Sequence, residues 1–129
     1  MLDLMSKAIL DKARVRDALE RSWSAETSKC YSKDAFPSYG QCAQTAILIH
    51  ELFGGDILCT TGWHGRGRHF YNRINDERID FTSDQFEMPS YSYQLIYEDR
   101  LSSIAEALEE TLPNQVDNLR RAFLSVYSL

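Results

Sequence analysis

Cys42 stands where a loop gives way to a strongly apolar helical segment, and this position could make it a nucleophile. The loop ahead of it carries Pro37 and Gly40. At the start of a helix the backbone N–H groups are unpaired and the helix dipole is positive, so a thiol there is favoured in its thiolate form. Because the thiolate is the reactive form of cysteine, we interpret Cys42 as a candidate nucleophile.

His69 and Asp80 supply the other residue types of a thiol catalytic triad. The histidine would hold the thiolate as an ion pair and later protonate the leaving group, while the aspartate would orient the imidazole. The oxyanion formed during acyl transfer needs fixed hydrogen-bond donors. The backbone N–H of Cys42 is the first candidate donor, and the side-chain amide of Gln41 is the second.

Two predicted strands, 68–74 and 77–81, would bring the histidine and the aspartate together across a tight turn. If Asn75-Asp76 is a two-residue loop, the register makes Asp80 the diagonal neighbour of His69 on one face, with about 7–8 Å between the backbones. A three-residue loop would place them on opposite faces. The geometry is therefore permissive, and it depends on the turn.

The remaining pattern predicts a single α+β domain over residues 1–129. In chain order we expect a helix over 4–22, a long polar loop over 23–40, a helix over 41–53, strands over 56–61, 68–74 and 77–81, a loop or one helical turn over 82–89, a strand or irregular edge over 90–97, and helices over 101–111 and 114–127. The Cys42 helix should pack on the small antiparallel sheet, with helices at both ends of the chain.

Composition narrows the class of protein. The chain has 129 residues, 43% hydrophobic and 26% charged, with a net charge of −5, which is typical of a globular domain and disfavours nucleic acid as a partner. We expect no membrane span and no signal peptide. Three cysteines without paired spacing favour the cytoplasm. Neither Cys-x-x-Cys nor His-Glu-x-x-His occurs, so we expect no metal and no cofactor.

Several ordered motifs resemble the YunG-like family of small bacterial proteins. They are Trp23-Ser24-Ala25-Glu26-Thr27-Ser28, Gly40-Gln41-Cys42-Ala43-x-Thr45-Ala46, Phe53-Gly54-Gly55-Asp56-Ile57, His69-Phe70-Tyr71-Asn72-Arg73 and Ile79-Asp80-Phe81-Thr82-x-x-Gln85-Phe86. The resemblance implies a papain-like or transglutaminase-like core, with the nucleophile at Cys42, the base at His69 and the orienting acid at Asp80. The insert over 63–68 departs from the family pattern.

Each functional interpretation has a structural alternative. Cys30 and Cys59 are best read as packed thiols, and His50 as a core or surface residue. His64 is the substitute base if the hairpin register is wrong. Asp80 could instead cap the turn at 82–83 or pair with Arg78.

The long loop and the arginines also allow two interpretations. Trp23 and Glu26 belong either to a packed loop or to a cleft wall that touches substrate. The arginines at 66, 68 and 73 form either a solvated loop or a patch that steers an anionic substrate.

We predict a thiol enzyme that acts on an amide or related acyl bond of a peptide, a protein or a small amide, through a thioester. Peptide hydrolysis, deamidation and acyl transfer to an amine all share this intermediate. The alternative is a catalytically inactive module that holds a peptide or protein partner in the same cleft. A third possibility is redox sensing, with Cys30 as the resolving partner of Cys42.

Overall fold

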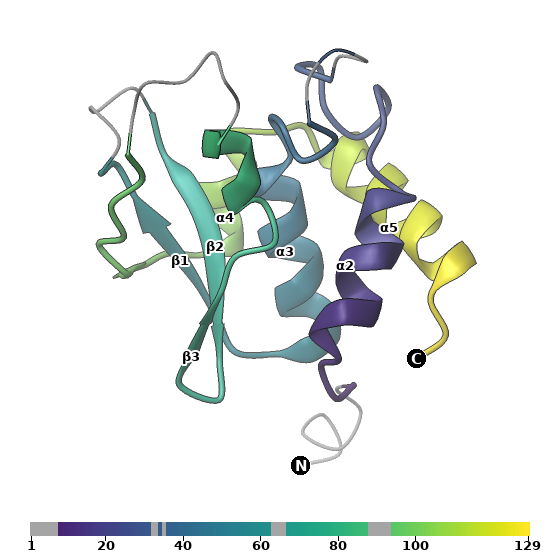
Figure 1. The fold of residues 1–129 in the computed structure, drawn as a ribbon, viewed down its shortest axis with the longest axis horizontal. Helices are drawn as coiled ribbons and strands as arrows, with labels where there is room; N and C mark the ends of the chain where they lie inside the picture. Colours follow the sequence, from purple (N-terminus) through teal and green to yellow (C-terminus); the bar gives the residue numbers. More distant parts are fainter. Residues whose placement is uncertain (1–7, 32–33, 35, 63–66, 88–93) are drawn as a thin grey trace.

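A four-stranded antiparallel sheet lies against helix α3, and further helices cover the other side of that helix (Figure 1). The computed structural model describes residues 8–31, 34, 36–62, 67–87 and 94–129. Within them the elements are α2 (Lys12–Glu20), α3 (Cys42–Phe53), β1 (Asp56–Thr60), β2 (His69–Ile74), β3 (Glu77–Ile79), the 3-10 helix η1 (Ser83–Glu87), β4 (Arg100–Leu101), α4 (Ile104–Leu108) and α5 (Pro113–Val126). The strands lie in the spatial order β3-β2-β1-β4. The predicted α+β class is confirmed.

Helix α3 is the centre of the hydrophobic core. Its residues are apolar on nearly every side, and Ile47, Leu48 and Ile49 are each at most 1% exposed. One side packs with α2 and α5 through a cluster that includes Val15, Leu19, Leu48, Ile49, Leu119 and Phe123. The other side packs on the sheet through Ala43, Ala46, Ile47, Ile57, Cys59 and Phe70. Burial on both sides fixes the axis of α3, and with it the position of Cys42 at its first turn.

The β2–β3 hairpin has the register that a two-residue turn predicts. Asn75 and Asp76 both adopt positive φ, at 52° and 64°, as in the type I′ turns that suit the twist of a hairpin. Ile74 pairs with Glu77. Strand β3 ends at Ile79, so Asp80 leaves the sheet directly after its last paired residue.

The chain ends differ from the expected pattern. Helix α2 begins at Lys12, where Asp11 caps it by accepting a hydrogen bond from the Arg14 N–H at 3.2 Å. The helix expected over 4–22 is therefore wrong over residues 8–11, which are not helical, and its residues 4–7 lie outside the described ranges. The helix expected over 101–111 is wrong at its start, because Leu101 belongs to β4 and pairs with β1. Helix α4 begins only after Ser103, whose side chain supplies its N-cap.

The region predicted as a strand or irregular edge over 90–97 is described only from residue 94 onward. There the backbone forms an isolated antiparallel bridge between Gly62 and Ile96. In the described ranges, no helix combines the length and apolar character that crossing a membrane would need.

Candidate active site

His69 and Asp80 meet at the end of the β2–β3 hairpin. His69 is the first residue of β2, and its side chain is 1% exposed. Its Nε2 atom lies 2.7 Å from Oδ2 of Asp80, whose side chain is 5% exposed. The hairpin register thus places the two groups on one face, as the sequence predicts, and the bend after β3 closes the remaining distance.

Asp80 combines two roles that the sequence presented as alternatives. Its Oδ1 atom accepts a hydrogen bond from the Thr82 N–H at 3.1 Å, so it does stabilise the turn after β3. Its Oδ2 atom contacts His69 and also accepts a hydrogen bond from Tyr97 Oη at 2.7 Å. Arg78 is paired with Asp99 at 2.6 Å instead. The carboxylate is therefore held from both oxygens, with Oδ2 facing the imidazole.

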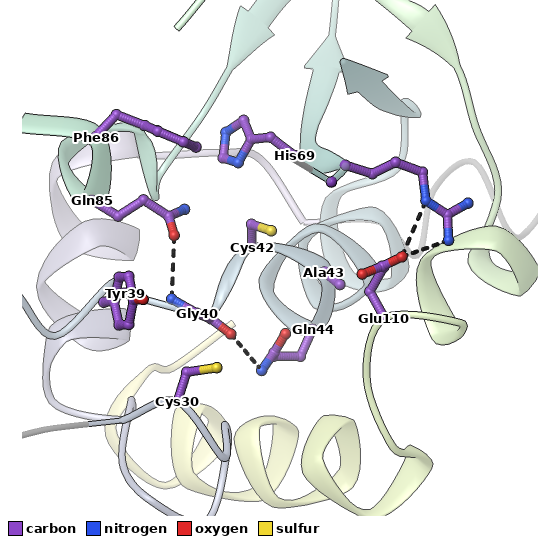
Figure 2. Close-up of a pocket in the computed structure, with 12 residues that line it drawn as sticks. Cys30, Tyr39, Gly40, Cys42, Ala43, Gln44, His69, Gln85, Phe86 and Glu110 are labelled. Atoms are coloured by element: carbon purple, nitrogen blue, oxygen red, sulfur yellow. Dashed lines mark hydrogen bonds and ion pairs between the residues drawn. The ribbon is translucent and has the colours of Figure 1, made fainter. Parts of the chain in front are cut away.

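Cys42 lies on the opposite side of the imidazole from Asp80. Figure 2 shows the His69 ring facing the Cys42 side chain across the first turn of α3. The buried Nδ1 atom of His69 makes no hydrogen bond of ordinary geometry within the described residues. Burial alone would lower the pKa of His69, but the contact with the Asp80 carboxylate and the proximity of the Cys42 sulfur raise it to about 9. The imidazole is therefore favoured in its charged form beside the sulfur.

A cavity of about 230 Å³ opens beside these groups. It is lined by Cys30, Tyr39, Gly40, Cys42, Ala43, Gln44, Gly67, Arg68, His69, Gln85, Phe86 and Glu110. The Phe86 ring meets the His69 ring edge-on, with 4.8 Å between centroids. The sulfur and the imidazole thus border a space into which a small acyl group or an extended side chain could enter.

Gly40 allows the tight turn just ahead of Cys42. Its φ is 75°, in the left-handed region that favours glycine. A Cβ atom at this position would lie 2.6 Å from Cys30 Cβ and 2.8 Å from Ser28 Oγ. The turn ahead of Cys42 therefore packs directly against the loop that contains Cys30, which brings both thiols to the same cavity.

The segment after β3 is fastened to the loop ahead of α3. Arg16 Nη1 donates to Phe81 O at 2.6 Å, and Arg16 Nη2 pairs with Asp84 Oδ2 at 2.9 Å. Asp84 Oδ1 accepts a hydrogen bond from Ser38 Oγ at 2.5 Å. These bonds hold helix α2, the 3-10 helix η1 and the loop ahead of α3 together.

The three residues proposed to contact the oxyanion or substrate lie elsewhere. Gln41 is 0% exposed, and its Oε1 atom accepts from Thr27 Oγ1 at 2.8 Å, which turns the amide away from the cavity. Trp23 is 4% exposed and donates its indole N–H to Thr45 Oγ1 at 2.9 Å. Glu26 is exposed at a separate depression beside α5. The packed-loop interpretation fits these positions.

The other candidate residues are also placed. His50 is in the last turn of α3, far along the helix axis from Cys42, and its Nδ1 atom lies 2.8 Å from Gly55 O. Arg68 pairs with Glu106, Glu109 and Glu110, and Arg73 pairs with Asp56. His64 and Arg66 lie outside the described residues. Where the chain is described, no group of three or more His, Cys, Asp or Glu side chains is arranged to hold a metal ion.

Gln85 and Phe86 are cavity residues to which the sequence assigned no role. Both occur in the motif quoted for the family resemblance, which was the available signal. Their position depends on how η1 packs against the loop ahead of α3, a contact between segments more than 40 residues apart. Periodicity does not reveal such a contact.

Comparison with known proteins identifies the family. A model described as "YunG protein" matches residues 11–128. The chain is 39% identical over 112 residues to the Bacillus subtilis (strain 168) protein named "Uncharacterized protein YunG", covering 84% of this chain and 88% of that relative. This chain belongs to the YunG family. No solved structure gives a significant match.

Proposed function

We propose that this protein is a thiol enzyme in which Cys42, His69 and Asp80 act on an amide or related acyl bond. The observation that carries the proposal is the position of the imidazole. Its Nε2 atom lies 2.7 Å from the Asp80 carboxylate, and the edge of the ring that bears Nδ1 is turned toward Cys42 (Figure 2). Catalysis of acyl transfer by a thiol uses a nucleophile beside a base, with the base in contact with an orienting acid. The adjoining cavity supplies room for the acyl group.

The proposed reaction uses His69 as the proton carrier. The Cys42 thiolate attacks the carbonyl carbon, a C–S bond forms, and the carbonyl oxygen becomes an oxyanion beside the Cys42 backbone N–H. The His69 imidazolium gives its Nδ1 proton to the leaving nitrogen as the C–N bond breaks, which leaves a thioester. Water or an amine then attacks the thioester while His69 takes its proton. The C–S bond breaks and the thiolate returns.

Peptidase, deamidase and acyltransferase activities share these steps and differ in the leaving group and the acceptor. We further propose that the fold is a reduced papain-like core, since a cysteine-bearing helix packs on strands that deliver the histidine and the aspartate. We place the protein in the cytoplasm, where its three unpaired cysteines would stay reduced.

Alkylation by iodoacetamide at pH 7, mapped to each cysteine by mass spectrometry, tests the nucleophile. Exposed Cys30 is the internal reference for an ordinary thiol. Buried Cys59, whose pKa burial raises, is the reference for an inert one. We expect Cys42 to react about tenfold or more faster than Cys30. His69→Gln should abolish that difference, whereas His50→Gln should preserve it.

The outcomes separate the enzyme from its rival. Equal rates for Cys42 and Cys30 in the wild-type protein would reject the thiolate–imidazolium pair. A catalytically inactive module that binds a peptide or protein partner in the cleft would then be the better account. Thermal unfolding of each variant shows whether a lost difference reflects chemistry or a damaged fold.

A further inference from the structure

Gln85 presents an amide to the cavity with its orientation fixed. The residue lies in η1, is 6% exposed and lines the cavity beside Cys42. Its side chain contacts the Gly40 N–H at 3.2 Å. Since a backbone N–H can only donate, the amide oxygen must face Gly40. The NH₂ group therefore points the other way.

The Nε2 atom of Gln85 is a buried donor. It makes no hydrogen bond with any of the described residues. Leaving such a donor buried and unpaired costs about 1–3 kcal/mol, so native proteins seldom do so without a reason. Figure 2 shows this nitrogen turned toward Cys42 and His69, on the cavity side of the Gly40 turn. Because this NH₂ group points into the cavity, we infer that a ligand there supplies the hydrogen-bond acceptor.

A second candidate donor is the backbone N–H of Cys42 itself. Cys42 is the first residue of α3, and the N–H groups of a first helical turn have no partner within the helix. The N-cap residue, Gln41, makes no side-chain hydrogen bond to them. Because Gln85 holds Gly40, two residues ahead of Cys42, the amide and the Cys42 N–H are coupled through a very short stretch of backbone.

We propose that Gln85 Nε2 and the backbone N–H of Cys42 together form the oxyanion hole, and that both donate hydrogen bonds to an acyl carbonyl oxygen of the substrate. This inference rests on the proposed function and replaces Gln41 with Gln85 as the side-chain donor. It agrees with the acyl substrates of the proposed function, in which a trigonal carbonyl becomes tetrahedral. A carbonyl carbon attacked by Sγ would carry its oxygen toward these two donors.

Two probes of Cys42 distinguish this role from a structural one. With p-nitrophenyl acetate, Sγ forms a bond to the acyl carbon through an oxyanion, and p-nitrophenolate leaves with the electron pair. With iodoacetamide, Sγ displaces iodide from a saturated carbon and no oxyanion forms. An oxyanion donor accelerates only the first reaction, while thiolate formation and access affect both.

Gln85→Glu is the decisive variant. It keeps an acceptor for the Gly40 N–H and removes the Nε2 donor at nearly constant volume. We expect the ratio of acylation rate to alkylation rate to fall about 10²-fold or more, the usual effect of losing one such donor. Gln94→Glu adds the same charge at an exposed position and should leave the ratio unchanged.

The outcomes are distinguishable from failure of the proposed function. If wild-type Cys42 shows neither selective alkylation nor acylation, the proposed function fails. If the wild type acylates and His69→Gln abolishes acylation, but Gln85→Glu changes both rates by the same factor, only the oxyanion role is overturned. Gln85→Met, which removes both polar atoms, should lower the ratio as Gln85→Glu does if the donor is what matters. An unchanged ratio in a folded Gln85→Met variant would also overturn the role.

Discussion

The hydroxyl of Tyr97 donates a hydrogen bond to the same Asp80 oxygen that contacts His69 Nε2, with both atoms 2.7 Å from Oδ2. Burial raises the pKa of Tyr97, and the Asp80 charge raises it further. The phenol therefore stays neutral and remains a donor. Asp80 is thus held in place by Tyr97 as well as by the backbone of the turn after β3.

Tyr97→Phe should remove that donor without disturbing the His69–Asp80 contact. A hydrogen bond to a charged, mostly buried group is worth about 1.5–3 kcal/mol, so the free energy of unfolding in urea should fall by about that amount. Acylation of Cys42 should decline less than it does in Asp80→Asn. A variant as stable as the wild type would show that the phenol contributes nothing to holding Asp80.

Asp80→Asn should separate orientation of the imidazole from folding. The amide is nearly isosteric, but it cannot stabilise the charged imidazole and it favours the wrong tautomer. We expect p-nitrophenyl acetate turnover to fall by about 10²–10⁴-fold. Asp56→Asn, at the partly exposed pair with Arg73, is the matched control and should retain turnover. Comparable loss in both variants would contradict a specific role for Asp80.

The pH dependence should follow the charged form of His69. Its pKa in the folded protein is about 9, above the ordinary value of about 6.5. A raised pKa means that the folded protein binds the proton more tightly than the unfolded chain does. The stabilisation is therefore complete below about pH 6.5 and is lost as the pH rises through about 9.

Two measurements check this pH window. The melting temperature should drop between pH 7 and 9.5 in the wild type more than in His69→Gln. Turnover of an amide substrate should decline on the alkaline side near pH 9, because the leaving group then lacks its proton donor. Iodoacetamide alkylation needs no proton donor and should not decline there. A shared alkaline decline of both reactions would exclude His69 as the cause.

Gly40→Ala should destabilise the loop ahead of α3. The added Cβ would meet Cys30 Cβ at 2.6 Å and would occupy a left-handed backbone conformation at φ 75°. Strain of this kind costs about 1–3 kcal/mol, measurable by urea unfolding. In a Cys30→Gly background the part due to Cys30 should disappear, while the contact with Ser28 Oγ at 2.8 Å and the backbone part should remain. Equal penalties in both backgrounds would show that the contact with Cys30 is unimportant.

Much of the fold could be predicted from local sequence patterns, because interactions between neighbouring residues determine those elements. The apolar run and paired glycines defined α3, and the Asn75-Asp76 turn fixed the hairpin register that places Asp80 near His69. These features depend on neighbouring residues. Strand β4, in contrast, is two residues long and exists only through its pairing with β1.

The direction of a polar side chain was harder to predict. Gln41 sits beside the nucleophile in sequence, yet Thr27, from the loop 14 residues earlier, draws its amide into the protein interior. Gln85 lies 43 residues after Cys42 and reaches the cavity through its contact with Gly40. Proximity along the chain points to Gln41, whereas long-range packing places the amide of Gln85 at the cavity.

The Arg16–Asp84 pair lies away from the sulfur, yet it fastens the segment that carries Asp80, Gln85 and Phe86. If that segment detached, the proposed orienting acid, the proposed oxyanion donor and one wall of the cavity would all be displaced together. Each molecule would then be either fully active or inactive, rather than partly active. Helix α2, which supplies Arg16 and contributes no cavity residue, would set the fraction of molecules that are competent at any moment.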